Sequence, residues 1–269
     1  MTDRTRQAVL SVRDLDVVMH GNGQASRVVR KLCFDLQAGE VLALVGESGC
    51  GKSKTAEAIM GLIPQRSGTV SAARIELAGS TIHGLPEAAM RRIRGREISM
   101  VFQEPLTALD PVFTCGSQLA VLFRRHRGQG RSEARASSER MLQQVGFADV
   151  KRVMRSYPHQ LSGGMRQRVI VAMAMACRPQ VLIADEPTTA LDVTTQAQVL
   201  QKLTRLGRDA GTAILLITHD LGIVAQYCDR ALVMHDGRIV EESDIGQLFS
   251  APVSDYTREL VAAAQGVSL

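Results

Sequence analysis

The chain has 269 residues, of which 45% are hydrophobic and 22% charged, and its formal net charge is +5. This is enough apolar material for one large core, or for a core with a smaller attached lobe. The polar first residues lead into no long apolar stretch, so no signal peptide is expected. The longest apolar run, Val169–Cys177, is far shorter than a bilayer crossing requires, which argues against a chain that spans a membrane by itself.

The charged residues and the cysteines exclude further classes of protein. Basic clusters at residues 91–96 and 124–127 could favour an anionic membrane surface or nucleic acid, although such runs are usually solvated faces. Only 3% of residues are aromatic and aromatic interleaving for base stacking is missing, so no nucleic-acid partner is expected. The five cysteines and six histidines are scattered without a C-x-x-C pair, which indicates reduced thiols and no zinc or iron–sulfur framework.

The first predicted elements are strands. Within the first 40 residues, apolar positions alternate, as at Leu32, Phe34 and Leu36, which predicts antiparallel strands. The next run, Val41–Val45, is continuously apolar, as is typical of a strand that is covered on both faces.

A phosphate-binding sequence directly follows this run. Residues Gly46–Ser53 spell G-x-x-x-x-G-K-S, in which the glycines let backbone N–H groups turn inward around phosphates. Lys52 can reach the β- and γ-phosphates, Ser53 can ligate Mg²⁺, and the helix that follows points its positive end at the anion. The alternative is a glycine-rich turn without a ligand, but the position between a buried strand and a helix favours phosphate binding.

A helical lobe is expected after the next strand. Ile98–Gln103 is predicted to be a strand, whereas residues from about 107 to 178 lack strand signals and predict several helices. The polar stretch Gly128–Ser138 is interpreted as a linker between these helices. The pattern suggests a helical lobe inserted into an α/β core.

A second candidate anion site lies inside this lobe. Leu161–Gln167 spells L-S-G-G-M-R-Q before a helical pattern, with Ser162 as a good N-cap. Gly163 and Gly164 leave the backbone N–H groups at the helix start exposed. Taken alone, the same residues are equally consistent with an ordinary loop.

Two carboxylates end the next predicted strand. Val181–Asp185 is a buried-type run, and Asp185 at its tip can hold a Mg²⁺ shell. Glu186, one residue further on, is expected to point in a different direction from Asp185 and can orient or deprotonate an attacking water. The alternative is a strand that ends at a solvated acidic turn, but the phosphate loop upstream favours the functional interpretation.

The last predicted elements complete an α/β pattern. Val199, Leu203, Leu206 and Ala210 are spaced as in a helix that Gly211 ends, and Ala213–Thr218 follows as a strand. Strand, helix and strand in this order indicate a parallel sheet. Near the end, Asp236-Gly237 lies between the segments 231–235 and 238–242, and this pattern predicts a hairpin with a primed turn.

Taken in order, these pieces resemble the ATP-binding subunits of ABC transporters across nearly the whole chain. The pieces are the phosphate loop, Gln103, the L-S-G-G-M-R-Q run, the V-L-I-A-D-E strand, Ala190-Leu191-Asp192 and Ile217-Thr218-His219-Asp220. The resemblance implies an α/β fold with a P-loop NTPase (RecA-like) core, an N-terminal antiparallel β subdomain and an inserted α-helical subdomain. It places the core and β subdomain at about 1–103 and 179–250, the helical subdomain at 104–178, and a tail at 251–269.

The resemblance also implies the site residues. Two such subunits would pair head to tail, with ATP between the phosphate loop of one and the Ser-Gly-Gly signature of the other. Gln103 would sense the γ-phosphate and Mg²⁺, Asp192 would lie at the subunit contact, and His219 would contact the γ-phosphate. The expected catalytic residues are Glu186 and His219, and the expected Mg²⁺ ligands are Ser53, Gln103 and Asp185. The expected nucleotide-binding residues are Gly46, Glu47, Ser48, Gly49, Cys50, Gly51, Lys52, Ser53, Thr55, Gln103, Ser162, Gly163, Gly164 and Asp192.

A finer resemblance points to one group of importers. Phe102–Pro111 looks like the F-Q-D-P-x-x-S-L-N-P stretch of the oligopeptide, dipeptide and nickel importer group, and Pro252–Leu260 looks like its P-x-x-x-Y-T-x-x-L ending. Peptide-importing members generally continue with a Cys-containing tail that is missing here. This makes the ending closer to nickel-importer ATPases, with a truncated peptide-importer subunit as the alternative.

Two departures from the family pattern stand out. Members usually stack an aromatic side chain on adenine from the first hairpin, but the region of Val18, Met19 and His20 has no Phe or Tyr, so stacking would fall to His20 or be weak. Glu104 and Asp110 replace the commoner Asp and Asn, where the helical lobe is expected to meet a membrane partner.

The expected function is therefore an ATP-hydrolysing subunit, with ATP and Mg²⁺, of an importer for nickel or peptides. The expected partners are two transmembrane permease subunits, a second and related ATP-binding subunit, and indirectly a substrate-binding protein, at the cytoplasmic face of the inner membrane. One alternative is a soluble ABC-type ATPase in DNA repair or chromosome maintenance, but its long coiled-coil or zinc insertions are absent from the sequence. A translation-associated member would normally carry two ATP domains, and Glu186 and His219 argue against a regulator that binds nucleotide without hydrolysis.

Overall fold

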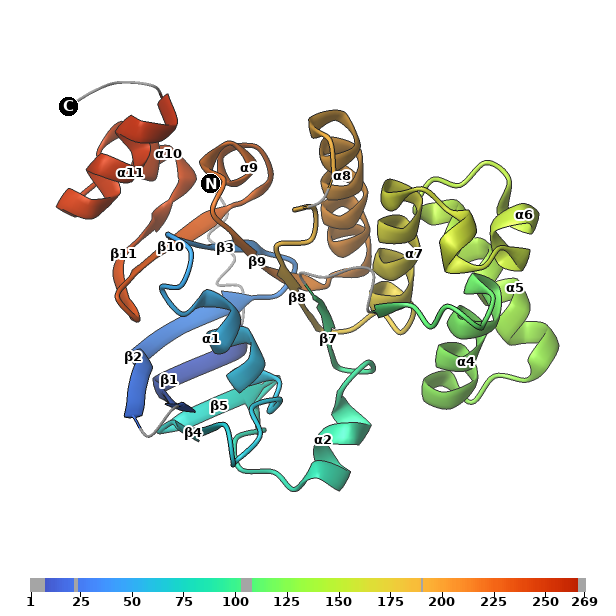
Figure 1. Cartoon of the computed structure of the whole chain (residues 1–269), viewed down its shortest axis with the longest axis horizontal. Helices are drawn as coiled ribbons and strands as arrows, with labels where there is room; N and C mark the ends of the chain where they lie inside the picture. Colours follow the sequence, from blue (N-terminus) through green and yellow to red (C-terminus); the bar gives the residue numbers. More distant parts are fainter. Residues whose placement is uncertain (1–7, 22–23, 103–107, 190, 266–269) are drawn as a thin grey trace. The chain divides into compact units, whose positions relative to one another are not determined.

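The computed structural model describes residues 8–21, 24–102, 108–189 and 191–265. The chain divides into two compact units, one formed by residues 1–91 and 213–269 and the other by residues 92–212. Figure 1 labels the helices and strands of both units.

The first unit begins with the predicted antiparallel sheet. β1 (Ala8–Gly21) pairs with β2 (Gln24–Gln37) on one side and with β4 (Gly68–Ser71) and β5 (Arg74–Leu77) on the other, and β6 (Ser80–Thr81) pairs with β5. The register places Val12 opposite Phe34 and Leu10 opposite Leu36. These four side chains are buried, so the alternation of apolar residues sets which face of the sheet is covered.

A parallel set of strands carries the phosphate loop in the same unit. β3 (Val41–Val45) lies between β9 (Ala213–Thr218) and β10 (Arg230–His235), and every residue of β3 and β9 is buried. Continuous burial of this kind explains the unbroken apolar runs. β10 continues through a turn into β11 (Arg238–Asp244), and the positive φ angles of Asp236 (46°) and Gly237 (78°) confirm the primed turn.

The helices described in this part of the chain are α1 (Lys52–Ile59), α2 (Glu87–Ile93), α9 (Leu221–Tyr227), α10 (Ile245–Ser250) and α11 (Asp255–Gln265). α9, α10 and α11 contribute Val224, Leu248 and Val261 to a buried cluster with Val45 of β3 and Val233 of β10. These helices therefore cover one face of the strands that lead into the phosphate loop (Figure 1).

The second unit combines a strand pair with helices. β7 (Ile98–Val101) runs parallel to β8 (Val181–Asp185). The strand was predicted to reach Gln103, but it ends at Val101: Phe102 lies outside it, and Gln103 lies outside the described residues. The helices are α4 (Cys115–Arg127), α5 (Arg131–Gln144), α6 (Val150–Arg155), the short 3₁₀ helix η1 (Pro158–Gln160), α7 (Gly163–Met175) and α8 (Val193–Ala210).

The prediction of a polar linker at Gly128–Ser138 is wrong for most of that range, which is helical. Only residues 128–130 connect helices, because α5 begins at Arg131. Ala134, Ser138, Met141 and Leu142 are buried along one side of α5, and the Ser138 hydroxyl donates to the Ala134 carbonyl oxygen at 2.7 Å. Within the predicted linker this inner face consists of alanine and serine, so the apolar periodicity that predicts a helix is weak there.

Among the described residues, no helix combines the length and the apolar character that a membrane crossing requires.

Candidate nucleotide site

The phosphate loop lies between β3 and α1, and two of its glycines are required by close packing. A Cβ atom at Gly46 would lie less than 3.0 Å from the Met234 carbonyl oxygen, and one at Gly51 would lie less than 3.0 Å from the Val28 carbonyl oxygen. Gly51 also has a φ of 112°, which side-chain-bearing residues rarely adopt. The loop is therefore pressed against the backbone of β2 and β10.

Lys52 lies inside this loop. The residue is only 5% exposed, and its ammonium donates to the carbonyl oxygens of Gly46 (2.7 Å) and Glu47 (2.8 Å). Carbonyl oxygens carry only partial charge, so a phosphate oxygen would be a stronger partner for a buried ammonium. The donor set of the loop thus fits an anionic ligand.

The start of α1 supports the same conclusion. Gly51 occupies the N-cap position, and it has no side chain with which to cap the first turn of the helix. Uncapped N–H groups at a helix start, together with the helix dipole, favour an anion. Thr55, which the resemblance places in the nucleotide set, is fully buried and donates its hydroxyl to the Gly51 carbonyl oxygen at 3.0 Å, so it braces the loop from inside.

His219 follows β9 in the same unit. Because β3 and β9 are parallel with Val45 opposite Thr218, Gly46 and His219 both leave the sheet at the carboxyl edge of these strands. His219 is exposed, whereas Asp220 caps α9 by accepting the N–H groups of Gly222 (2.7 Å) and Ile223 (3.3 Å). The cap fixes the turn on which the histidine stands.

The predicted acidic pair ends β8 in the second unit. Asp185 is buried, whereas Glu186 is half-buried and has a φ of 43°. A positive φ at a glutamate costs free energy and is found mainly where the surrounding structure enforces it. The Thr189 hydroxyl lies 2.8 Å from Glu186 Oε2 and donates to it, a restraint that no sequence pattern announced.

The signature loop (Ser162–Gly164) and the start of α8 at Asp192 pack together in this unit. Ser162 caps α7 by accepting the Met165 N–H at 3.3 Å, as predicted. A Cβ atom at Gly164 would lie less than 3.0 Å from Thr195 Cγ2, so α8 packs directly against the signature glycines. Asp192 accepts the Thr195 N–H at 3.0 Å, and this hydrogen bond lowers the pKa of its carboxyl group.

The last residue of the L-S-G-G-M-R-Q run is buried in α7, which the sequence pattern did not predict. Gln167 is 1% exposed, and among the described residues neither its amide oxygen nor its amide nitrogen has a hydrogen-bond partner. An unpaired amide in the interior is costly. Gln103, the glutamine that was predicted to contact the γ-phosphate and Mg²⁺, lies outside the described residues.

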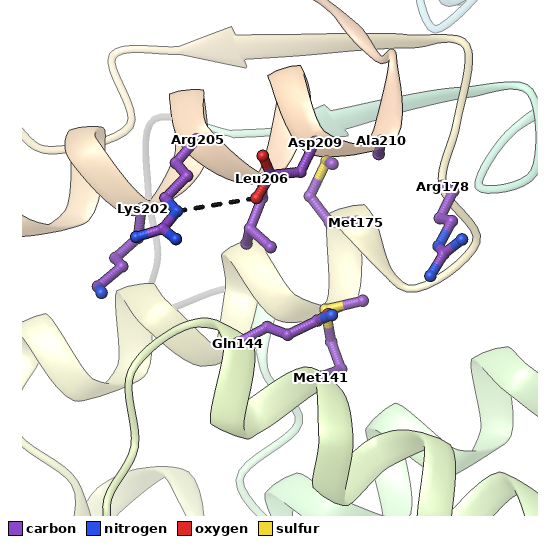
Figure 2. A pocket seen from close by; sticks show the side chains of 9 residues that line it. All are labelled: Met141, Gln144, Met175, Arg178, Lys202, Arg205, Leu206, Asp209 and Ala210. Atoms are coloured by element: carbon purple, nitrogen blue, oxygen red, sulfur yellow. Dashed lines mark ion pairs between the residues drawn. The ribbon is translucent and has the colours of Figure 1, made fainter.

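A cavity of about 420 Å³ in the second unit is separate from the predicted site residues (Figure 2). It lies where α5, α7 and α8 end, at Gln144, Met175 and Ala210. Helix C-termini carry partial negative charge, which the basic side chains that line the cavity offset. These are Arg178, Lys202 and Arg205, the last paired with Asp209 at 3.8 Å (Figure 2).

A phosphate loop at the end of a parallel strand, an acidic strand end and a capped Ser-Gly-Gly helix start define an ATP-binding cassette. The ABC transporter family model matches residues 29–189, which is more than half of the chain. The chain belongs to the ABC transporter family, whose ATP-binding cassettes hydrolyse ATP.

Relatives with known names agree with this assignment. The chain is 49% identical over 260 residues to the glutathione import ATP-binding protein GsiA of Salmonella paratyphi A, covering 95% of this chain and 42% of the relative. It is 48% identical over 263 residues to the peptidoglycan transport ATP-binding protein YejF of Agrobacterium fabrum, covering 98% of this chain and 48% of the relative. The chain therefore spans less than half the length of these relatives.

Solved structures show the same fold. The dimeric structure of MJ0796, a bacterial ABC transporter cassette, superposes with a TM-score of 0.77 at 25% identity, covering 88% of this chain and 98% of the other. The structure of cbiO1 from Clostridium perfringens, part of the ABC transporter complex cbiONQ, gives a TM-score of 0.76 at 25% identity and covers 91% of each chain. The predicted cassette fold is confirmed.

Proposed function

We propose that the chain is the ATP-hydrolysing subunit of an importer for peptide-like cargo. The observation that carries the proposal is the buried Lys52 ammonium, which donates to two carbonyl oxygens of its own loop and lies 3.8 Å from the Cys50 sulfur. The names of the relatives, glutathione import and peptidoglycan transport, favour a peptide-like cargo. Nickel, which the ending of the sequence suggested, stays a prediction.

The loop would hold the triphosphate. Lys52 would exchange its carbonyl partners for β- and γ-phosphate oxygens, and the uncapped first turn of α1 would add backbone N–H donors. His219, exposed at the same strand edge, would donate to the γ-phosphate. The first hairpin offers His20 as a partner for adenine, and its ring nitrogen already lies 3.0 Å from the Thr69 hydroxyl.

Hydrolysis would depend on the acidic pair. The Ser53 hydroxyl and the Asp185 carboxylate are hard oxygen donors of the kind that Mg²⁺ prefers, with Gln103 as a further oxygen donor. When bound with ATP, Mg²⁺ would neutralise charge on the phosphates. Glu186 would orient the attacking water and take its proton, and the Thr189 hydroxyl would hold the carboxylate in place.

A second ATP-binding subunit, expected to be a related chain, is the proposed partner of the signature group. Ser162, Gly163 and Gly164 would complete the ATP site of that partner through the N-terminus of α7. Asp192 caps α8 beside Val193, whose side chain is 83% exposed. An apolar side chain presented in this way fits burial against another chain.

Two permease subunits are the proposed membrane partners, and a substrate-binding protein would act through them. The second unit exposes large apolar side chains around the start of α4 and beside β7, with a cavity of about 420 Å³ that Met100, Leu122 and Met173 help to line. An apolar hollow of this kind fits a docked segment of another protein. The exposed residues are Phe102, Val112, Phe113 and Val121. Such docking would hold the chain at the cytoplasmic face of the inner membrane.

The decisive experiment compares the parent chain with Glu186→Gln. The amide cannot accept the water proton, so we expect unchanged MgATP affinity, loss of hydrolysis by at least about 100-fold, and a trapped dimer. Lys52→Ala should instead weaken binding itself. Parent-like hydrolysis by Glu186→Gln would overturn the assignment of the base, and ATPase activity that DNA stimulates would favour the DNA-repair alternative.

A separate experiment tests the cargo. Permease subunits that co-purify with the chain from membranes would be reconstituted in lipid vesicles with their binding protein. ATP-dependent uptake of glutathione or a short peptide is the expected result. Uptake of Ni²⁺ without uptake of peptides would replace the proposed cargo with nickel.

A further inference from the structure

The C-terminal helix α11 contacts the phosphate loop through one side chain. The Tyr256 hydroxyl accepts the backbone N–H of Glu47, the second residue of the loop, at 3.2 Å. Both residues belong to the same compact unit. Tyr256 belongs to the Y-T ending that resembles one group of importers, and the proposed ATP mechanism gives it no role.

Several contacts hold Tyr256 in place. Its ring lies against the ring of His235, with the centroids 4.0 Å apart. Val261 and Leu260, on the same helix, pack on the cluster that covers β3 and β10. The ring contact and the packing of α11 therefore set where the hydroxyl lies against the loop.

The start of α11 is also anchored. The buried carboxylate of Glu241 on β11 accepts the N–H groups of Val253 (3.0 Å) and Ser254 (2.8 Å). Thr257 is fully buried and donates its N–H to the Ser254 hydroxyl oxygen at 3.0 Å. Burial raises the pKa of Tyr256, so its hydroxyl stays neutral at physiological pH.

The hairpin beneath the tyrosine contacts the loop at a second point. The Gly237 N–H in the β10–β11 turn donates to the Cys50 carbonyl oxygen at 3.0 Å. Glu47 and Cys50 bracket the middle of the loop, and each is tied to the group formed by the hairpin and Tyr256. These two hydrogen bonds restrain the loop at two separate peptides.

We propose that Tyr256 is a positioning residue of the phosphate loop, whose hydroxyl fixes the Glu47 peptide and so couples the seating of α11 to nucleotide affinity. The inference rests on the proposed ATP site and adds to it a dependence on the C-terminal helix. A loop that is already ordered loses less conformational entropy when it binds phosphates. Displacement of α11 would therefore lower the affinity for MgATP without altering any group that touches it.

The test compares Tyr256→Phe, which keeps the ring beside His235 and removes the hydroxyl, with Tyr227→Phe on α9. Both tyrosines are partly buried in the same unit, and burial raises the pKa of each. We expect Tyr256→Phe to raise the Kd for MgATP and the KM for ATP by about 2- to 10-fold, the range that one hydrogen bond gives. The kcat and the apo-protein Tm should match those of Tyr227→Phe.

Hydrogen–deuterium exchange supplies a second readout. Amides of residues 44–53 should exchange faster in Tyr256→Phe than in the parent, with no change in residues 150–175. A lowered apo-protein Tm with parent-like Kd and parent-like exchange would show that Tyr256 is only a packing residue and would overturn the proposal. A parent chain that binds no MgATP would overturn the proposed function as well, so the two failures are distinguishable.

Discussion

The Cα atom of Gly164 faces the side chain of Thr195 so closely that a Cβ atom there would lie less than 3.0 Å from Thr195 Cγ2. The contact joins the signature loop to the first turn of α8, whose N-cap is Asp192. The two motifs that are proposed to meet a second subunit therefore pack against each other. They can lie this close because residue 164 is a glycine and has no Cβ atom.

Gly164→Ala should destabilise this group by about 1–3 kcal/mol through overpacking. Thr195→Ser removes the methyl carbon that the new Cβ would meet and keeps the hydroxyl, so the double variant should recover most of the loss. Urea unfolding of the two single variants and the double variant measures this. A double variant no more stable than Gly164→Ala would contradict the packing.

The Cys50 thiol should react slowly with alkylating reagents, and MgATP should protect it. Burial raises its pKa above the ordinary value, despite the nearby Lys52, so little thiolate forms at pH 7. We expect alkylation by iodoacetamide, followed by peptide mass spectrometry, to accelerate as the pH rises from 7 to 10. MgATP should slow it.

Cys33 provides the matched control, because it is an exposed thiol on β2. Its alkylation should be indifferent to MgATP. Equal protection of both cysteines would indicate a global change, and no protection of Cys50 would count against the proposed nucleotide pocket.

Glu241 should make stability depend on pH. Burial opposes its ionisation, but the N–H groups of Ser254 and Val253 outweigh this and lower its pKa below the ordinary 4.5. A carboxyl group whose pKa is lowered by folding stabilises the protein above that ordinary value, and this contribution is lost as the pH falls through the folded pKa.

Glu241→Gln should therefore lower the free energy of unfolding at pH 7 by about 1–2 kcal/mol, because hydrogen bonds to a charged acceptor are replaced by weaker ones. The difference from the parent should shrink as the pH falls below the ordinary value of 4.5 and through the lower folded pKa. Urea titrations between pH 3 and 7 measure it, with the exposed Glu259→Gln on α11 as control. A difference that grows in acid would show the wrong sign.

Gln167→Met should stabilise the chain. The methionine side chain has nearly the same shape, and it removes an amide that lies buried without a partner among the described residues. We expect a gain of about 1–2 kcal/mol in the free energy of unfolding. The exposed Gln198→Met on α8 should change it little. A loss of stability in Gln167→Met would mean that the amide is satisfied.

Much of the fold could be predicted because its strands are buried on both faces. β3, β8 and β9 match the predicted runs residue for residue, and α8 ends at Gly211 as expected. α5 was partly missed, because buried Ala134 and Ser138 form much of its inner face and serine is not read as an apolar signal.

The site was predictable as motifs but not as contacts. The order of glycines, lysine and serine around Lys52 follows from phosphate chemistry alone. The positive φ of Glu186, the Thr189 donor and the Tyr256 hydroxyl on the loop depend on where distant segments meet. The spacing of residues within a motif does not predict contacts between segments that are distant in the sequence.

The strand that carries the phosphate loop has consequences for how the chain is made. β3 finds both of its neighbours, β9 and β10, far downstream, and the Val41 N–H donates to the Asp229 carboxylate across 188 residues. On the ribosome, β3 emerges long before either neighbour exists, so its backbone groups stay unpaired while residues 46 to 212 are translated. A nascent chain would gain the ability to bind nucleotide only late in synthesis, and a ribosome stalled before residue 235 would carry an apolar strand for chaperones to recognise.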